Sequence, residues 1–142
     1  MKSGFVSIVG RPNVGKSSLI NAILGSKVSI VSSHPAITRI KILGVYNSKE
    51  GQVVFLDTPG FEKNSSELAK SMVRTIFSCV EDSDIVLFLL DANGWQEYDE
   101  KILESLKKFS KKIILVINKT DMLSQKDFLL PIIENSMSRY PF

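Results

Sequence analysis

A short glycine-rich segment has the residue types and the spacing of a phosphate-binding loop. Gly10-Arg11-Pro12-Asn13-Val14-Gly15-Lys16-Ser17 matches the pattern G-x-x-x-x-G-K-[ST] in full, and it lies between an apolar stretch and a helical pattern. Glycines let backbone N–H groups approach phosphate oxygens, and the start of a helix offers further unpaired N–H groups. We predict that Lys16 adds a positive charge between the β- and γ-phosphates of a nucleotide, that Ser17 offers Mg²⁺ a hydroxyl ligand, and that the octet together with Ser18 surrounds the phosphates.

A second motif, Asp57-Thr58-Pro59-Gly60, ends a predicted strand. Ligands bind at the carboxyl ends of the strands in open α/β sheets, so we expect these residues beside the phosphate loop. Asp57 would reach Mg²⁺ through a water, because Mg²⁺ keeps several of its waters, and the backbone N–H of Gly60 would meet a γ-phosphate. A hydroxyl from residues 32–39 would complete the ligand shell of the metal. Spacing alone does not choose among the three hydroxyls that this segment offers, Ser32, Ser33 and Thr38.

A third motif, Asn118-Lys119-Thr120-Asp121, follows the apolar run that ends at Ile117. An ionised carboxylate accepts hydrogen bonds and donates none. Guanine presents two adjacent donors, its N1–H and its exocyclic amine, and Asp121 can accept from both. Adenine has no such pair and would leave the carboxylate unpaired, which can discriminate by a factor of about 10⁴–10⁵. The three motifs, in this order along the chain, therefore predict a guanine nucleotide.

The elements that must position these motifs alternate between strand and helix patterns. Two runs, Ile85–Leu90 and Ile113–Ile117, are continuously apolar, as is typical of strands covered by helices on both faces. The second and third predicted strands are separated by a hairpin-sized loop, so we expect them to pair antiparallel. The predicted strands are Phe5–Val9, Ile40–Tyr46, Gln52–Leu56, Ile85–Asp91 and Lys112–Asn118, and the predicted helices are Lys16–Gly25, Ser65–Val80, Tyr98–Phe109 and Gln125–Ser138. This pattern predicts an α/β fold with a mostly parallel sheet, one antiparallel strand and helices on both faces.

The composition of the 142 residues is that of one ordinary globular domain, with 44% hydrophobic and 23% charged residues. The longest apolar run is far below the roughly 18 residues of a membrane-spanning helix, and the apolar stretch before Gly10 is too short for a secretory signal, so we expect a cytoplasmic protein. Cys79 is the single cysteine, which excludes an intramolecular disulfide and a thiolate zinc site. The net charge of +3 permits contact with nucleic acid or anionic lipid without arguing for either. A fold of this kind normally returns to the sheet with a further strand after the fourth helix pattern, so we expect the natural protein to be longer.

Together the three motifs resemble the G domain of the translation-factor-related GTPases, which are P-loop NTPases. The Gly-Arg-Pro-Asn start of the phosphate loop resembles the Era, Der and MnmE group within that class. Two further features resemble the Era family. They are the run Ser29-Ile30-Val31-Ser32 leading to Thr38-Arg39 and Ile42-Leu43-Gly44, and Trp95 directly after Asp91-Ala92-Asn93-Gly94. The resemblance covers nearly the whole chain.

The resemblance implies Mg²⁺-dependent hydrolysis of GTP to GDP and phosphate. The implied catalytic residues are Lys16, Thr38 and Gly60. The implied metal ligands are Ser17, Thr38 and Asp57 for Mg²⁺, and Asn13 for a potassium ion near the transferred phosphate. The implied nucleotide contacts beyond the phosphate loop are Asp57, Thr58, Pro59, Gly60, Asn118, Lys119, Thr120 and Asp121.

For the whole protein, the resemblance implies a molecular switch in the assembly of the small ribosomal subunit. Residues 1–142 would form a G domain that lacks its last strand and helix. A C-terminal KH domain would follow it and bind small-subunit ribosomal RNA and the 30S particle. The resemblance also implies a cytoplasmic protein that associates with the inner face of the cell membrane, and we expect it to be a monomer.

Two other interpretations stay open. The first is a Der- or MnmE-type G domain, which a second G domain downstream or a tRNA-modifying context would mark. The second is a nucleotide-occupied RNA-binding module with vestigial hydrolysis, and the intact set of motif residues argues against it. An ATPase is disfavoured by Asp121. One departure from the Era pattern, His34-Pro35-Ala36-Ile37 directly before Thr38, lies in the predicted first switch.

Overall fold

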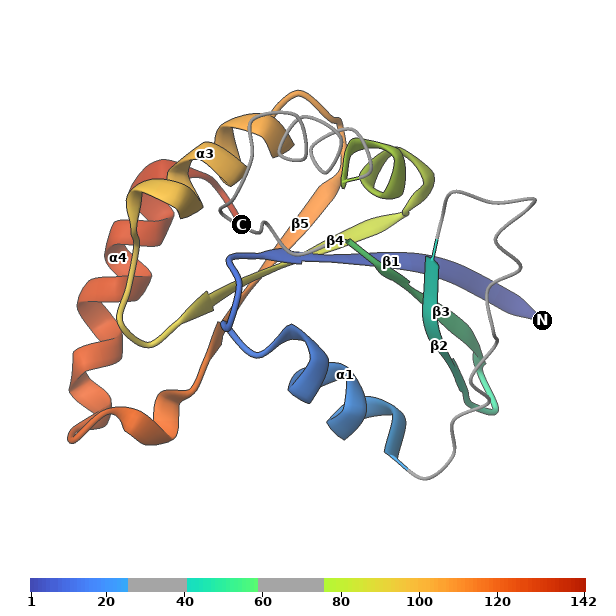
Figure 1. The fold of residues 1–142 in the computed structure, drawn as a ribbon, viewed down its shortest axis with the longest axis horizontal. Coiled ribbons are helices and arrows are strands. Elements are labelled where there is room, and N and C mark those ends of the chain that lie inside the picture. Colours follow the sequence, from blue (N-terminus) through green and yellow to red (C-terminus); the bar gives the residue numbers. More distant parts are fainter. Residues whose placement is uncertain (26–40, 59–75) are drawn as a thin grey trace.

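The computed structural model describes residues 1–25, 41–58 and 76–142, and within them five strands form one sheet in the order β2-β3-β1-β4-β5 (Figure 1). The strands are β1 (Lys2–Gly10), β2 (Lys41–Asn47), β3 (Gly51–Asp57), β4 (Ile85–Asp91) and β5 (Lys112–Asn118). β1 pairs in parallel with β3 and β4, and β4 pairs in parallel with β5. β2 pairs antiparallel with β3, which confirms the prediction from the short loop between them.

Helices cover both faces of the sheet, as predicted (Figure 1). The helices are α1 (Lys16–Leu24), α3 (Glu97–Leu106) and α4 (Leu129–Arg139), with further helical residues at 76–82. α1 lies against one face, α3 and residues 76–82 lie against the other, and α4 lies beside the outer strand β5. The helix predicted over Ser65–Val80 falls largely outside the described residues. In the three described ranges, no helix is long and apolar enough to cross a membrane.

The last helix begins later than the sequence pattern predicts. The prediction starts at Gln125, whereas α4 starts at Leu129 and a 3₁₀ turn occupies Lys126–Phe128. Pro131 explains the difference, because it has no N–H to donate to the carbonyl of Asp127 four residues earlier. Regular α-helical hydrogen bonding therefore does not extend back into this turn.

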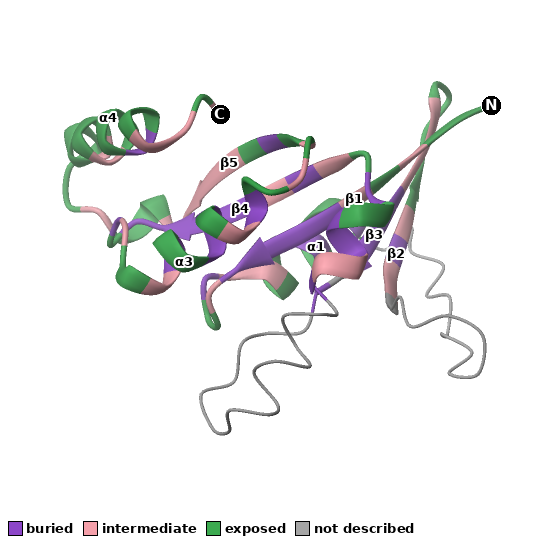
Figure 2. Cartoon of the chain, turned by 90° about the horizontal axis from the view of Figure 1, so that it is seen from above, coloured by how far each residue is buried: buried purple, intermediate pink, exposed green. Residues whose placement is uncertain are grey.

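Two apolar clusters, one on each face, hold the helices to the sheet. The cluster on the α1 face contains Ile8, Val14, Ile20, Leu24, Phe55 and Leu89. The cluster on the opposite face contains Val9, Ile76, Val80, Val86, Phe88, Ile102, Leu103, Leu106 and Ile113. Figure 2 shows that buried residues concentrate in the central strands β1 and β4. The carboxyl end of β1, which leads into the predicted phosphate loop, is thereby fixed, and β3 and β5, which lead into the other two motifs, belong to the same sheet.

The outer strand β5 corrects one prediction. Its continuous apolar run predicted cover on both faces, but Ile113 is the one residue of the strand that is buried, and Ile114 is 41% exposed. β4 fits the prediction, because Val86 and Phe88 are fully buried. The difference follows from the position of the strand. β5 is the last strand of the described sheet, whereas α1, the helix that covers one face, contacts β1 and β2.

Candidate nucleotide-binding site

The phosphate loop joins the end of β1 to the start of α1. Two of its residues have left-handed backbone conformations, Asn13 with φ 65° and Gly15 with φ 98°. Asparagine tolerates this region better than most residues, and glycine adopts it without steric cost. Gly15 is required for a second reason: a Cβ there would collide with the side-chain amide of Asn118. The loop therefore takes its shape from local backbone geometry and from a neighbour distant in the sequence.

Lys16 lies inside the curve of this loop. Its Nζ donates to the backbone carbonyl of Gly10 at 2.6 Å and to that of Arg11 at 3.2 Å. Ser17 and Ser18 follow at the start of α1, where both are exposed and where the first turn carries no acidic residue. A helix start with an adjacent ammonium group attracts an anion. This arrangement fits the predicted phosphate contacts.

The base motif meets the phosphate loop from the end of β5. Asn118 Nδ2 donates to the carbonyl of Val14 at 2.9 Å, across 104 residues of sequence. Lys119 Nζ donates to the carbonyl of Asn13, across 106 residues. Lys119 itself has φ 60°, a conformation that non-glycine residues adopt at a cost of about 1–3 kcal/mol and mostly at functional sites. Two motifs predicted independently from the sequence thus form one hydrogen-bonded unit.

The two remaining residues of the base motif directly follow the pair that bonds to the phosphate loop. Thr120 and Asp121 lie in a 3₁₀ turn, Thr120–Met122, and both are exposed. Asp121 is therefore at the surface, two residues after Lys119, which bonds to the phosphate loop. Sequence reasoning assigned Asn118 and Lys119 to guanine as well, and the structure adds that both brace the loop.

The end of β3 lies next to the phosphate loop in the sheet. Asp57 pairs with Ile8 in the parallel ladder, two residues before Gly10. Thr58 is 3% exposed, and its hydroxyl donates to the carbonyl of Ile8. Thr58 was predicted to contact nucleotide, but the structure shows that its side chain ties β3 to β1. The side chain of Asp57 and the predicted residues Thr38, Pro59 and Gly60 lie outside the described part of the chain.

The side chain of Arg11 contacts two carboxylates, and the contact of this residue with phosphate stays a prediction. Its guanidinium Nε lies 2.8 Å from both carboxylate oxygens of Asp99, and Nη2 lies 3.4 Å from Asp91 Oδ2. Asp99 is fully buried, and burial raises the pKa of its carboxyl above that of an exposed aspartate, against the lowering effect of a Gln96 backbone hydrogen bond and of Arg11. Sequence reasoning missed both aspartates. The only signal was that Asp91 ends a buried strand, and the sequence held no signal for Asp99.

The donor set fits a hard divalent cation. Ser17 offers a neutral oxygen at the start of α1, and β3 brings the backbone of Asp57 to the neighbouring strand end. Among the described residues, no three His, Cys, Asp or Glu side chains gather into a metal cluster. Mg²⁺ beside nucleotides commonly takes most of its ligands from water and phosphate oxygens and few from the protein.

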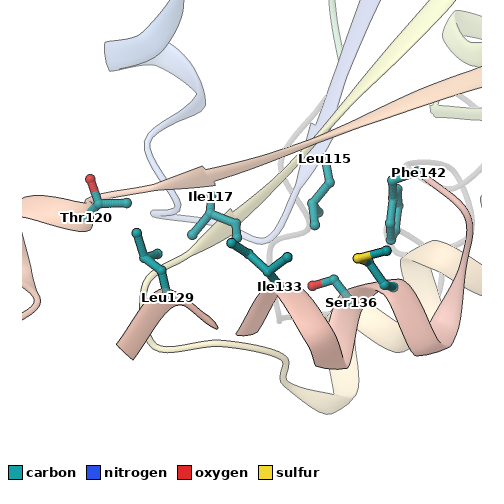
Figure 3. Close-up of a pocket in the computed structure, with 8 residues that line it drawn as sticks. Leu115, Ile117, Thr120, Leu129, Ile133, Ser136 and Phe142 are labelled. Carbon is teal, nitrogen blue, oxygen red and sulfur yellow. The ribbon is translucent and has the colours of Figure 1, made fainter. Parts of the chain in front are cut away.

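A second concavity lies away from the phosphate loop, between β5 and α4 (Figure 3). Leu115 and Ile117 of β5 point toward Leu129 and Ile133 of α4, and Phe142 borders the far end. The lining is mostly apolar, and Ile133 is 40% exposed. The groove contains none of the predicted site residues except Thr120 at its rim.

The strand–loop–helix unit around Lys16, together with the Asn118 and Lys119 bonds to the loop, defines a G domain of the P-loop GTPase class. A family model described as "50S ribosome-binding GTPase" matches residues 5–119, and the chain belongs to this family. Within it, the chain is similar to GTPase Era. It is 44% identical to GTPase Era of Aquifex aeolicus over 99% of this chain and 48% of that protein.

Solved structures show the same likeness. The chain matches a crystal structure of Era in complex with MgGDPNP and nucleotides 1506–1542 of 16S ribosomal RNA, with a TM-score of 0.82 and 42% identity over 99% of this chain and 48% of that one. It matches a variant of Aquifex aeolicus Era bound to GDP·AlF4⁻ with a TM-score of 0.81 and 43% identity over 99% and 48%. The chain thus spans about half the length of these proteins.

Proposed function

We propose that the chain is the G domain of an Era-type GTPase, which binds GTP and hydrolyses it with Mg²⁺. One observation carries the proposal: Asn118 and Lys119, at the end of β5, hold the backbone of the phosphate loop. These two hydrogen bonds hold two motifs with separate predicted roles, phosphate binding and base recognition, at a fixed separation across more than 100 residues of sequence. A single ligand that needs a phosphate cradle and a base reader at a fixed separation accounts for this arrangement.

Different residues of this chain would bind the phosphates, the base and the metal ion. The ammonium of Lys16 and the N–H groups at the start of α1 bind the phosphates and stabilise charge that develops as the γ-phosphate leaves. Asp121 accepts from the two donors of guanine, and the braces from Asn118 and Lys119 fix the distance between the two ends. Ser17 and Asp57 would hold Mg²⁺, which neutralises charge on the β- and γ-phosphates when bound.

The finer assignments in the site rest on the motif resemblance. They are that Thr38 and Gly60 sense the γ-phosphate, and that Asn13 holds a potassium ion. Asn13 is exposed at the mouth of the loop, so a cation could reach it. A monovalent cation there would stabilise the same developing charge that an arginine finger stabilises in other GTPases.

The chain is proposed to continue past residue 142 in the natural protein, with a last strand and helix and then a KH domain. β5 is an outer strand of the described sheet, and the apolar groove between β5 and α4 offers a strand or helix a place to pack (Figure 3). Support also comes from the matched Era proteins, of which this chain spans 45–48%.

The proposed cellular role is a switch in assembly of the 30S particle, working as a cytoplasmic monomer that contacts the inner face of the membrane. The support is that an Era neighbour was solved with a segment of 16S ribosomal RNA, joined to the motif resemblance. The Era likeness at 44–48% identity favours this over a Der- or MnmE-type role. The intact Lys16 and Ser17 favour it over a module with vestigial hydrolysis.

The test is nucleotide binding and turnover by the full-length protein. Calorimetric titration should show tight binding of GTP and GDP, with ATP weaker by a factor of about 10⁴. Single-turnover assays should show phosphate release from GTP that requires Mg²⁺ and stops with a chelator. Binding of ATP as tight as that of GTP would overturn the base assignment. Tight GTP binding without any phosphate release would favour the vestigial alternative.

A further inference from the structure

Arg11 is held by a buried carboxylate on α3. Its Nε is 2.8 Å from Oδ1 and 2.8 Å from Oδ2 of Asp99, across 88 residues of sequence. The side chain of Asp99 is 0% exposed and that of Arg11 is 12% exposed. A charge-assisted contact of this length between buried groups is stronger than a surface ion pair. The first variable position of the phosphate loop is therefore anchored to a helix that lies outside the loop.

The same carboxylate also fixes the start of α3. Asp99 Oδ2 accepts from the backbone N–H of Gln96 at 2.8 Å, which completes a capping box at the first turn of the helix. A second acid approaches from β4: Asp91 Oδ2 is 3.4 Å from Arg11 Nη2, and Asp91 Oδ1 accepts from the N–H of Asn93 at 3.0 Å. Two separate elements thus hold one guanidinium.

The backbone of Arg11 leads directly to the phosphate-binding lysine. The carbonyl of Arg11 accepts from Lys16 Nζ at 3.2 Å, and the carbonyl of Gly10 accepts from it at 2.6 Å. The guanidinium and the carbonyl belong to one residue, so an anchored side chain limits how the peptide can rotate. The orientation of the Lys16 ammonium therefore depends on the anchor.

The positive charge of Arg11 is neutralised by neighbouring carboxylates. Two carboxylates face it, so its guanidinium adds no net positive potential for phosphates. A buried ion pair is seldom retained for stability alone, because desolvation offsets most of the attraction. A planar guanidinium bonds a carboxylate in a fixed geometry, whereas the lysine ammonium is a point charge on a flexible stem. Arginine is therefore better suited to holding the backbone of its own residue in place.

We propose that Arg11 is a positioning residue of the nucleotide site: Asp99 and Asp91 fix its guanidinium, and its peptide carbonyl in turn orients the Lys16 ammonium toward the β- and γ-phosphates. α3 and the end of β4 thereby set the geometry of the phosphate loop. This inference rests on the proposed function, because it assigns a role within the same site.

The experiment compares ligands that do and do not reach Lys16. The full-length protein is titrated with GTP, GDP and GMP, using competition against a fluorescent GDP for the weak ligand. Arg11→Met and Asp99→Asn should each weaken GTP and GDP binding by about tenfold or more, since small displacements of a positioned group cost that much. GMP lacks the phosphates that Lys16 contacts, so its affinity should stay within about threefold.

Two matched controls disturb α3 without touching the loop. Glu100 is the neighbour of Asp99 and pairs with Arg139 of α4 at 2.8 Å. Glu100→Gln and Arg139→Met repeat the same chemical changes at this partly exposed pair. Both should leave GDP affinity within about twofold, as expected for surface ion pairs.

The outcomes separate the inference from the proposed function. If the unmodified protein binds neither GTP nor GDP, the proposed function fails. If it binds both and Arg11→Met weakens GMP as much as GDP, or weakens none of them, the positioning role is wrong while the function stands. If Arg11→Met does not fold, Arg11→Lys replaces it. This variant keeps the positive charge but lacks the planar guanidinium that contacts Asp99. It should still weaken GDP more than GMP, and equal effects on the two would overturn the inference.

Discussion

The phosphate-loop end of the sheet and the outer edge at β5 and α4 are built in opposite ways. At the loop, Val14 is fully buried, and the polar groups around it bond to one another across distant segments. At the outer edge, Ile133 and Met137 are 40% and 70% exposed and line an apolar groove, and Ile114 of β5 is 41% exposed. The first region is held together by polar contacts between distant segments, and the second presents apolar surface.

The difference shows that a binding site and an outer edge of the sheet have different structural requirements. A phosphate cradle must be held before the ligand arrives, because ordering it on binding would reduce affinity. Apolar surface at an edge does not affect the ligand, although it lowers the stability of the part that carries it. We therefore expect substitutions in the two regions to change different quantities, nucleotide affinity in the first and stability in the second.

The largest effect is expected from Asp121→Asn, which changes recognition without loosening the loop. The amide cannot accept from both donors of guanine, but it can donate to the 2-oxo group of xanthine and accept from its N1–H. The preference for GTP over xanthosine triphosphate should shift by up to about 10⁴-fold. Competition binding of the two nucleotides measures the shift. A variant that binds GTP normally and still rejects xanthine would break the assignment of the base site.

A matched pair of isoleucine truncations, both at the outer edge, compares a buried position with an exposed one. Ile113→Ala removes a side chain that is 3% exposed, and should lower the free energy of unfolding by about 2–5 kcal/mol. Ile133→Ala, at 40% exposure, should cost less than about 1 kcal/mol in this 142-residue chain. Urea denaturation followed by circular dichroism gives both values. If the proposed C-terminal continuation covers the groove, Ile133→Ala should cost clearly more in the longer protein, and equal costs would contradict that proposal.

Lys16→Ala tests the phosphate end. The change removes a charge-assisted hydrogen bond worth roughly 1.5–3 kcal/mol, so nucleotide affinity should fall at least tenfold. We expect the melting temperature without nucleotide to change less than the affinity, because the two described hydrogen bonds of Lys16 go to carbonyls of the loop itself. Calorimetry of GDP binding and thermal melting of the same samples separate the two quantities. Unchanged affinity would rule out the phosphate loop.

The smallest effect concerns the monovalent cation. If Asn13 holds potassium near the transferred phosphate, GTP turnover by the full-length protein should be several-fold faster in potassium than in sodium at equal ionic strength, because the cation stabilises developing charge. Asn13→Ala should remove the difference while leaving GDP binding nearly intact. Equal rates in the two salts for the unmodified protein would count against the cation site.

Local patterns located most of the site. The octet ending at Ser17 and the motif ending at Asp121 were predicted from residue types and spacing, and the strands that carry them lie within a few residues of their expected bounds. Strand periodicity and phosphate-loop chemistry are local properties, so the sequence displays them. The same reasoning failed for β5, because an apolar run does not tell a strand inside the sheet from one at its edge.

The sequence by itself therefore determined the kind of fold and the phosphate-loop motif, and it predicted a guanine reader at Asp121, since each depends on neighbouring residues. Only the tertiary structure decided that Asn118 holds Val14, that Thr58 ties β3 to β1, and that Asp99 binds the guanidinium of Arg11. These contacts join residues 104, 50 and 88 positions apart. Such partners are chosen by the strand order and by which side chains the core buries together, and no spacing along the chain contains that information.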